Sequence, residues 1–271
     1  MLVFNCTKLA ADFFSVTQRG KKISPIEPAP KCTIAQSLND NAGQTPSDLT
    51  SYLDTSIQWH WLVHAIKVKG KSVLVVMDCK SRFSITLTGI KKGDDMAFLN
   101  AFEHHLTAHV HEIMALASAN IDAIDDSLER YYQQHNSCKF YQRGDASVQA
   151  HINDVIWHFR SVADEQRTLP SGVDLITHDV FVNKLLRKRK AEKKYFEPQY
   201  EFLFGWLKQY GQYNSAQTDQ YMEYYRAKER ATFAAKYPGL AQGNRAPNNS
   251  VAGISSDADN VISLDTYRKK S

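Results

Sequence analysis

Apolar and polar residues alternate most regularly between Trp61 and Thr88, where the pattern predicts three β-strands. In the first, apolar positions at 62, 66 and 68 alternate with polar or small ones, as in a half-buried strand. Residues 73–77 are apolar without interruption, which is typical of a central strand covered on both faces. Apolar side chains occupy every second position in residues 82–88, which predicts a strand with one solvent-exposed face, the wet face. The short connections at 69–72 and 78–81 favour an antiparallel meander.

The neighbouring segments have the three- and four-residue spacing of amphipathic helices. After Asp94, a candidate N-cap, apolar residues recur as far as Ala117 at the spacing that packs on a sheet. A second helix is predicted over 121–134, and a third begins at Asp145 or Ser147 and ends near 164. Weaker signals predict strands at 2–6 and 139–141, a helix at 7–16, and a long connecting loop over 20–50.

Beyond residue 170 the chain becomes basic and aromatic. A helix is predicted over 180–194, another begins at Glu197-Pro198, and 218–236 favours one more. From Pro238 onward Asn, Ser, Gly and Asp dominate, as in a flexible tail. We therefore predict an α+β fold in three parts. An antiparallel β-meander covered by helices spans residues 1–165, a helical basic and aromatic extension spans 166–211, and a weakly helical, then disordered tail spans 212–271.

Composition excludes several classes of protein. The 271 residues are 43% hydrophobic and 23% charged, which is enough apolar material for a core and argues against long-range disorder. No apolar run approaches the length of a membrane span, and the first residues lack the pattern of a secretory signal. The four cysteines lie far apart without a CxxC pair, which argues against a zinc ribbon or a disulfide scaffold. Reduced thiols in the cytoplasm are the expectation.

The basic run near the C-terminus predicts an anionic partner. Lys and Arg number 33 against 29 Asp and Glu, a formal charge of +4, and the excess gathers beside aromatic residues. Such a combination suits a phosphate backbone with stacked bases. A solvated helix face and an anionic protein partner are the alternatives. The predicted binding residues are Lys184, Arg187, Lys188, Arg189, Lys190, Lys193 and Lys194.

The predicted helix 94–117 contains a candidate metal site. His105, His109 and Glu112 stand at i, i+4 and i+7, so one flank presents two imidazoles and a carboxylate. Such a flank supplies three ligands to zinc or iron and leaves a position open for water. Partly buried histidines without a metal are the plainer alternative. A second set on one helix face consists of His151, Asp154 and His158.

Aromatic residues and histidines at the start of the first long strand form a candidate ligand pocket. Indole rings can stack on a ligand and imidazoles titrate near neutrality, although closure of the core is the plainer role. The pocket residues are Trp59, His60, Trp61 and His64. Residues 65–72 match a relaxed phosphate-loop pattern, but a strand follows where that motif requires a helix, so a hairpin turn is predicted at Gly70.

Several short motifs follow one another along the first 165 residues. They are Asn5-Cys6-Thr7-Lys8, Trp59-His60, Val75-Val76-Met77-Asp78, Ser81-Arg82-Phe83, Gly89-Ile90-Lys91 and the stretch 143–154. Their order resembles a bacterial family catalogued only as a domain of unknown function, over about residues 1–165. The resemblance implies a small α+β domain and transfers no activity, cofactor or catalytic residue. It suggests one group for joint testing: Trp59, His60, Asp78, Ser147, Asn153 and Asp154.

Three functions from different classes follow. The preferred one is a non-catalytic, cytoplasmic binding module that engages nucleic acid or another polyanion through 184–194. The second is a metal-dependent hydrolase with zinc as cofactor at the His-rich helix 104–112. The third is a protein partner or homo-oligomer formed through the aromatic helix 196–210. Binding ranks above catalysis because no nucleophile–base pair or cofactor fingerprint is recognised in the sequence, and no membrane partner is predicted.

Overall fold

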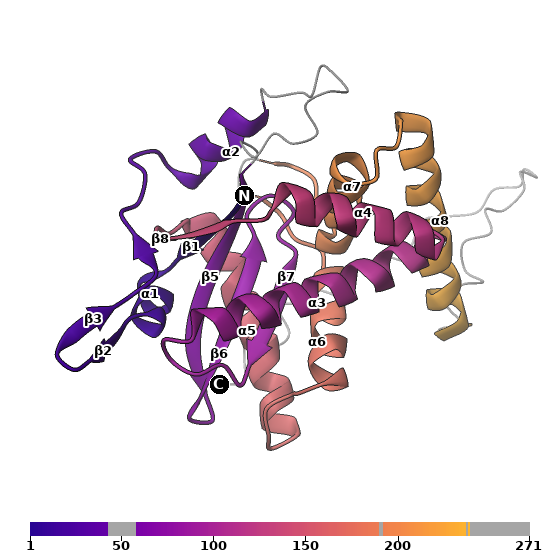
Figure 1. Cartoon of the computed structure of the whole chain (residues 1–271). Coiled ribbons are helices and arrows are strands. Elements are labelled where there is room, and N and C mark those ends of the chain that lie inside the picture. The colour runs from indigo at the N-terminus through magenta and orange to yellow at the C-terminus, as the bar shows by residue number, and fades with distance from the viewer. Residues whose placement is uncertain (43–57, 190–191, 237, 239–271) are drawn as a thin grey trace, which may run out of the picture. The chain divides into compact units, whose positions relative to one another are not determined.

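The computed structural model describes residues 1–42, 58–189, 192–236 and 238 (Figure 1). Met1–Arg230 form one compact unit; the second, Ala231–Ser271, is described only over 231–236 and at 238. Nearly all of the tail predicted from Pro238 onward, and the last part of the predicted loop, therefore lie outside the described residues. Within the described part, no helix is both long and apolar enough to cross a bilayer.

A six-stranded mixed sheet, with the strand order β4-β8-β1-β5-β6-β7, lies at the centre of the first unit. Its antiparallel half is the predicted meander: β5 (Trp59–Val68), β6 (Lys71–Asp78) and β7 (Ser84–Thr88). Lys69 and Gly70 connect β5 to β6 with φ angles of +47° and +77°, the left-handed backbone that a two-residue hairpin turn requires. Residues 65–72 are therefore a hairpin, as predicted.

The other half of the sheet is parallel, which corrects the prediction of an antiparallel sheet. β1 (Leu2–Cys6) lies between β5 and β8 (Cys138–Gln142), parallel to both, and β4 (Ile26–Glu27) is parallel to β8. Parallel neighbours need long crossovers, and local periodicity does not show which strands those crossovers bring together. The predicted loop 20–50 also contains β3 (Lys21–Ile23), which pairs with β2 (Val16–Gln18), and α2 (Ile34–Ala42).

Helices cover both faces of the sheet. One face carries α1 (Lys8–Phe14), α3 (Asp95–Leu116), α4 (Ile121–Gln134), α7 (Pro198–Gln209) and the first part of α8 (Ser215–Lys236), whose apolar side chains join the largest core cluster with Trp61. α5 (Ala146–Glu165) crosses the opposite face and packs on Leu62, Val75 and Met77 (Figure 1). Asp94 caps α3 as predicted, and of the two candidate caps for α5, Asp145 and Ser147, the cap is Asp145. The two His-bearing helices therefore lie on opposite faces of the sheet.

α6 (Val173–Lys184) lies along the outer edge of β7 and corrects two predictions. Ser84 and Thr86, expected on a wet face, are both fully buried because α6 covers them. The predicted helix does not continue through the described part of the basic stretch: α6 ends at Lys184, residues 185–189 and 192–194 are not helical, and Arg187 pairs with Phe196 in an antiparallel bridge. Consecutive cations repel one another at helical spacing, which disfavours a helix here.

Candidate metal centre

Side chains of α6 take the place of a neighbouring strand at the free edge of β7. The backbone N–H groups of Ser84 and Thr86 donate to Asn183 Oδ1 (2.8 Å) and Asp179 Oδ2 (2.9 Å), and Asn183 Nδ2 donates to the Ser84 carbonyl (2.8 Å). Asp179 and Asn183 are one helical turn apart, so both reach the same strand. This pairing fixes a fully buried carboxylate, Asp179, against the sheet.

α3 brings two imidazoles to the same carboxylate. His109 is 1% exposed, and its Nε2 lies 3.7 Å from Asp179 Oδ2, too far for a normal hydrogen bond. His105, one turn earlier on α3, is half-buried. One ligand atom from each of His105, His109 and Asp179 can be chosen so that all three lie within 4.8 Å of one another. Two histidines and a carboxylate from separate helices therefore converge beside β7.

Several residues of this cluster have buried polar atoms without a hydrogen-bond partner. In the described part of the chain, four such atoms belong to residues that contact Asp179 or cluster with it: His105 Nδ1, His109 Nε2, His178 Nε2 and Thr86 Oγ1. Buried polar atoms in native proteins are nearly always paired. His178 also donates through Nδ1 to Asp179 Oδ1 at 3.2 Å, so the carboxylate is held on both oxygens while the imidazole nitrogens around it retain unused bonding capacity.

The charges of the cluster suit a cation. Burial raises the pKa of the Asp179 carboxyl, but His109, His178 and the Thr86 N–H outweigh burial and hold that pKa below its usual range. Burial lowers the pKa of His105, against the opposing effect of Asp179. An ionised carboxylate and a neutral imidazole are the protonation states in which Asp179 and His105 would bind a metal.

The geometry fits a metal ion after a small contraction. Ligand atoms on one tetrahedral zinc lie about 3.4 Å apart, given metal–ligand bonds of about 2.1 Å. The three atoms here lie within 4.8 Å of one another, so an inward movement of roughly 1 Å would complete the set. Rotation of His105, which is only half-buried, can supply part of it.

Of the three metal ligands predicted from sequence, the structure brings together two. His105 and His109 meet Asp179, whereas Glu112 is exposed and lies outside the cluster. Asp179 is about seventy positions further along the chain and was missed because helical spacing reports only neighbours on one helix. Its sequence signal is weak but visible: His178-Asp179 interrupts the apolar residues of α6.

The second predicted metal set remains dispersed. His151 Nε2 lies 3.3 Å from the Lys188 carbonyl, the ring of His158 packs edge-on against Phe181, and Asp154 is exposed. These three residues do not form a close group of metal-binding atoms among those that the structure describes. α5 and α3 are separated by the sheet, so the two histidine flanks do not meet.

The predicted pocket divides between the two faces of the sheet, because successive strand residues point in opposite directions. Trp59 and Trp61 pack together in the aromatic core, and Trp59 Nε1 donates to Asp78 Oδ1 at 3.0 Å. His60 lies on the other face, with its Nδ1 3.3 Å from Arg143 Nη2. His64 Nδ1 lies 2.9 Å from Thr7 Oγ1.

Several of the predicted polyanion-binding residues make contacts within the chain. Lys184 pairs with Glu229 at 3.0 Å, and Arg189 pairs with Glu192 at 2.9 Å. Arg187 is buried, and Lys190 lies outside the described residues. Lys188, Lys193 and Lys194 are exposed. The aromatic face of α7, predicted to dock on another chain, is largely buried in this chain's own core.

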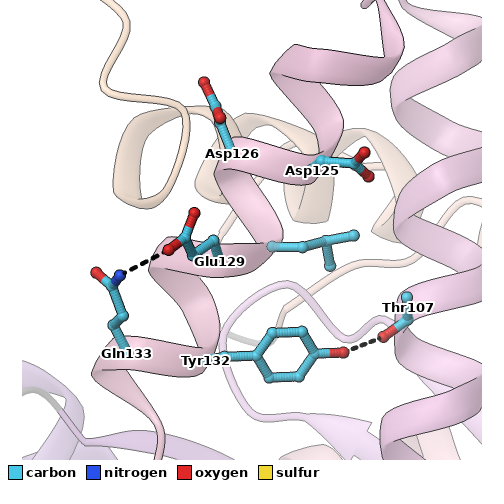
Figure 2. A pocket seen from close by; sticks show the side chains of 7 residues that line it. Thr107, Asp125, Asp126, Glu129, Tyr132 and Gln133 are labelled. Atoms are coloured by element: carbon cyan, nitrogen blue, oxygen red, sulfur yellow. Dashed lines mark hydrogen bonds between the residues drawn. The ribbon is translucent and has the colours of Figure 1, made fainter.

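An open hollow between α3 and α4 contains none of these residues. Figure 2 shows Asp125, Asp126 and Glu129 along α4, with the Tyr132 hydroxyl 2.9 Å from Thr107 Oγ1 of α3. The hollow measures about 620 Å³ and is acidic.

Comparison with known families gives one match. A family model described as "Domain of unknown function (DUF6933)" matches residues 31–201, about 63% of the chain. The match confirms the resemblance predicted from the motifs, but it begins later than residue 1 and continues past 165 through α6 into α7. No curated protein and no solved structure matches the chain.

Proposed function

The chain belongs to the DUF6933 family, whose description assigns no activity, and we propose a function for it from its geometry. The protein binds one divalent transition-metal ion at His105, His109 and Asp179 and is a metal-dependent hydrolase. The observation that carries the proposal is the convergence of the three side chains around a buried carboxylate, with two of the imidazole nitrogens unpaired. Two histidines and a carboxylate form a ligand set used by both zinc and non-haem iron.

The chain's own residues would position the ligands. The Thr86 N–H and His178 Nδ1 hold the two oxygens of Asp179, so its carboxylate needs little reorganisation. His105 is the half-buried member of the set and marks the side from which solvent and substrate would enter. When bound, a metal ion would lower the pKa of a coordinated water to about 7 and so supply a nucleophile for hydrolysis at neutral pH.

The metal proposal is tested by metal content together with a matched pair of variants. We expect His105→Ala to lose stoichiometric zinc or iron, measured by elemental analysis after dialysis and by titration of the metal-free protein. His104→Ala, at the exposed neighbouring position, should retain it. His105 is preferred to Asp179 for this test because Asp179 also holds the edge of β7.

A third variant separates the two possible ligand sets. Glu112→Gln should bind metal like the unaltered protein, since Glu112 lies outside the cluster. Absence of stoichiometric binding of zinc, iron or manganese to the folded, metal-free protein would overturn the proposal. Loss of metal in Glu112→Gln, together with retention in His105→Ala, would do the same.

A second candidate function is binding of a polyanion through the exposed part of the basic stretch. Lys188 Nζ lies 5.7 Å from the centre of the Tyr195 ring, and that tyrosine is 66% exposed. An exposed aromatic ring beside lysines suits a nucleic-acid strand. We expect salt-dependent binding of labelled RNA or DNA that charge reversal at Lys188, Lys193 and Lys194 abolishes. Binding that is insensitive to salt would eliminate this candidate.

A further inference from the structure

Among the residues that the structure describes, two buried arginines on the α5 side of the sheet have no acidic partner within ion-pair distance. Arg82 and Arg187 are each 6% exposed. Neither guanidinium lies within 4.0 Å of a carboxylate among the described residues, although eight ion pairs elsewhere in that part of the chain meet this limit. Arginine is almost never fully buried without a partner, since an isolated charge is costly away from water.

Their hydrogen bonds go to neutral acceptors. Arg82 donates to the Cys79 carbonyl and to Ser147 Oγ, the latter at 2.9 Å. Arg187 donates to the carbonyls of His151 (3.0 Å) and Val182 (3.2 Å). The Nε atoms of both arginines are buried and have no partner. These contacts position the guanidinium groups and leave their charge without a direct counter-ion.

The two arginines belong to one junction of three segments. His151 Nε2, on α5, lies 3.3 Å from the Lys188 carbonyl, and Arg189 Nη2 donates to the Lys80 carbonyl at 2.8 Å. The turn between β6 and β7, the first half of α5 and residues 187–189 therefore meet here.

The electrostatics of the junction agree with this proximity. Burial lowers the pKa of Arg187 to about 10; nearby Asp154 raises it and Arg82 lowers it further. Burial also lowers the pKa of Arg82, while Asp78 and Asp145 raise it. The acidic groups are thus near enough to moderate both charges without contacting them.

We propose that Arg82 and Arg187, together with Ser147, bind a phosphate-class oxyanion at this junction. Two guanidinium groups supply two positive charges, which suit a dianion, and arginine forks match the oxygens of phosphate. Ser147 is exposed and marks the entrance. None of these residues belongs to the metal cluster, so the proposal is independent of it.

Inorganic phosphate is the probe. Thermal unfolding of the full chain at constant ionic strength, balanced with chloride, should show a midpoint rise of about 3 to 6 °C at a tenfold excess of phosphate over its Kd. Calorimetric titration should give one site per chain. A folded protein with neither a midpoint shift nor a calorimetric signal in phosphate would overturn the proposal.

A pair of serine variants on α5 distinguishes this site from a general salt effect. Ser147→Glu places a carboxylate where Arg82 Nη2 now donates, so it should raise the midpoint without phosphate and abolish the phosphate response. Ser161→Glu adds the same charge at an exposed position near the other end of α5 and should keep the response. Equal phosphate responses in the two variants would contradict the proposal. Ser147→Ala, the milder change, should weaken phosphate binding several-fold.

Discussion

The side chain of Asn183 stands in for a strand at the edge of β7, so Asn183→Ala measures what that replacement contributes to stability. The alanine variant removes three hydrogen bonds, which join Asn183 to the N–H, carbonyl and hydroxyl of Ser84 at 2.8, 2.8 and 3.1 Å. Ser84 is fully buried, and its N–H and carbonyl at this edge would then have no partner on α6. An unsatisfied buried group costs about 1 to 3 kcal/mol, so the two backbone groups together cost about 2 to 6 kcal/mol.

That loss is a large fraction of the stability of a typical domain, which is about 5 to 15 kcal/mol. Urea unfolding, followed by the fluorescence of the four tryptophans, is a suitable assay. With an m-value of about 2.5 kcal/mol/M, the midpoint should fall by about 1 to 2.5 M.

The matched control is Asn153→Ala on α5. Asn153 is exposed, and its described hydrogen bond is to the Gln149 amide at 3.1 Å, so this variant should stay within about 0.5 kcal/mol of the unaltered protein. If Asn183→Ala were no more destabilising than Asn153→Ala, the edge of β7 would not depend on α6, and the account of how Asp179 is positioned would fail with it.

Three further outcomes are expected. Gly93→Ala should destabilise the protein more than Gly89→Ala. Both glycines have φ near +80°, but a Cβ on Gly93 would collide with the Val16 side chain, whereas nothing lies within 4 Å of a Cβ on Gly89. Urea unfolding should show free energies of unfolding that differ between the two variants by about 1 to 3 kcal/mol. Burial, and then the charge of Arg143, lower the pKa of His60 from 6.5 to about 4. The unfolded chain therefore takes up a proton before the folded one does, and the free energy of unfolding falls as the pH drops from about 6.5 to about 4. Between pH 7 and pH 4.5, His60→Gln should lose about 2 to 3 kcal/mol less of this free energy than the unaltered protein, and equal losses would refute the assignment. Because burial lowers the pKa of His105, zinc binding should persist on acidification to a lower pH than at an exposed histidine site, and its loss already near pH 6.5 in a zinc titration would contradict this.

Local sequence patterns were enough for elements whose contacts are close in sequence. The meander β5-β6-β7 follows from strand periodicity and two short turns, and the bounds predicted for α4 agree with the structure at both ends. The caps Asp94 and Asp145 were also visible, because a capping side chain bonds to backbone only two or three residues ahead. The parallel placement of β1 could not be predicted from local patterns, because its partners β5 and β8 begin about 57 and 136 positions later.

Asp179 combines what the sequence could and could not predict about the candidate site. The i, i+4 spacing of His105 and His109 placed two ligands on one flank of α3, since helix geometry relates neighbours on the same helix. No spacing rule relates that flank to α6, which reaches it only because β7 lies at the edge of the sheet and offers N–H groups that a carboxylate can accept. The pairing of α6 with β7 therefore both buries the face of β7 that was predicted to be wet and places Asp179, the third ligand, beside the two histidines. A charged residue among the apolar residues of a helix indicates such a contact in the sequence. The pattern shows which residue makes the contact but not which residue is its partner.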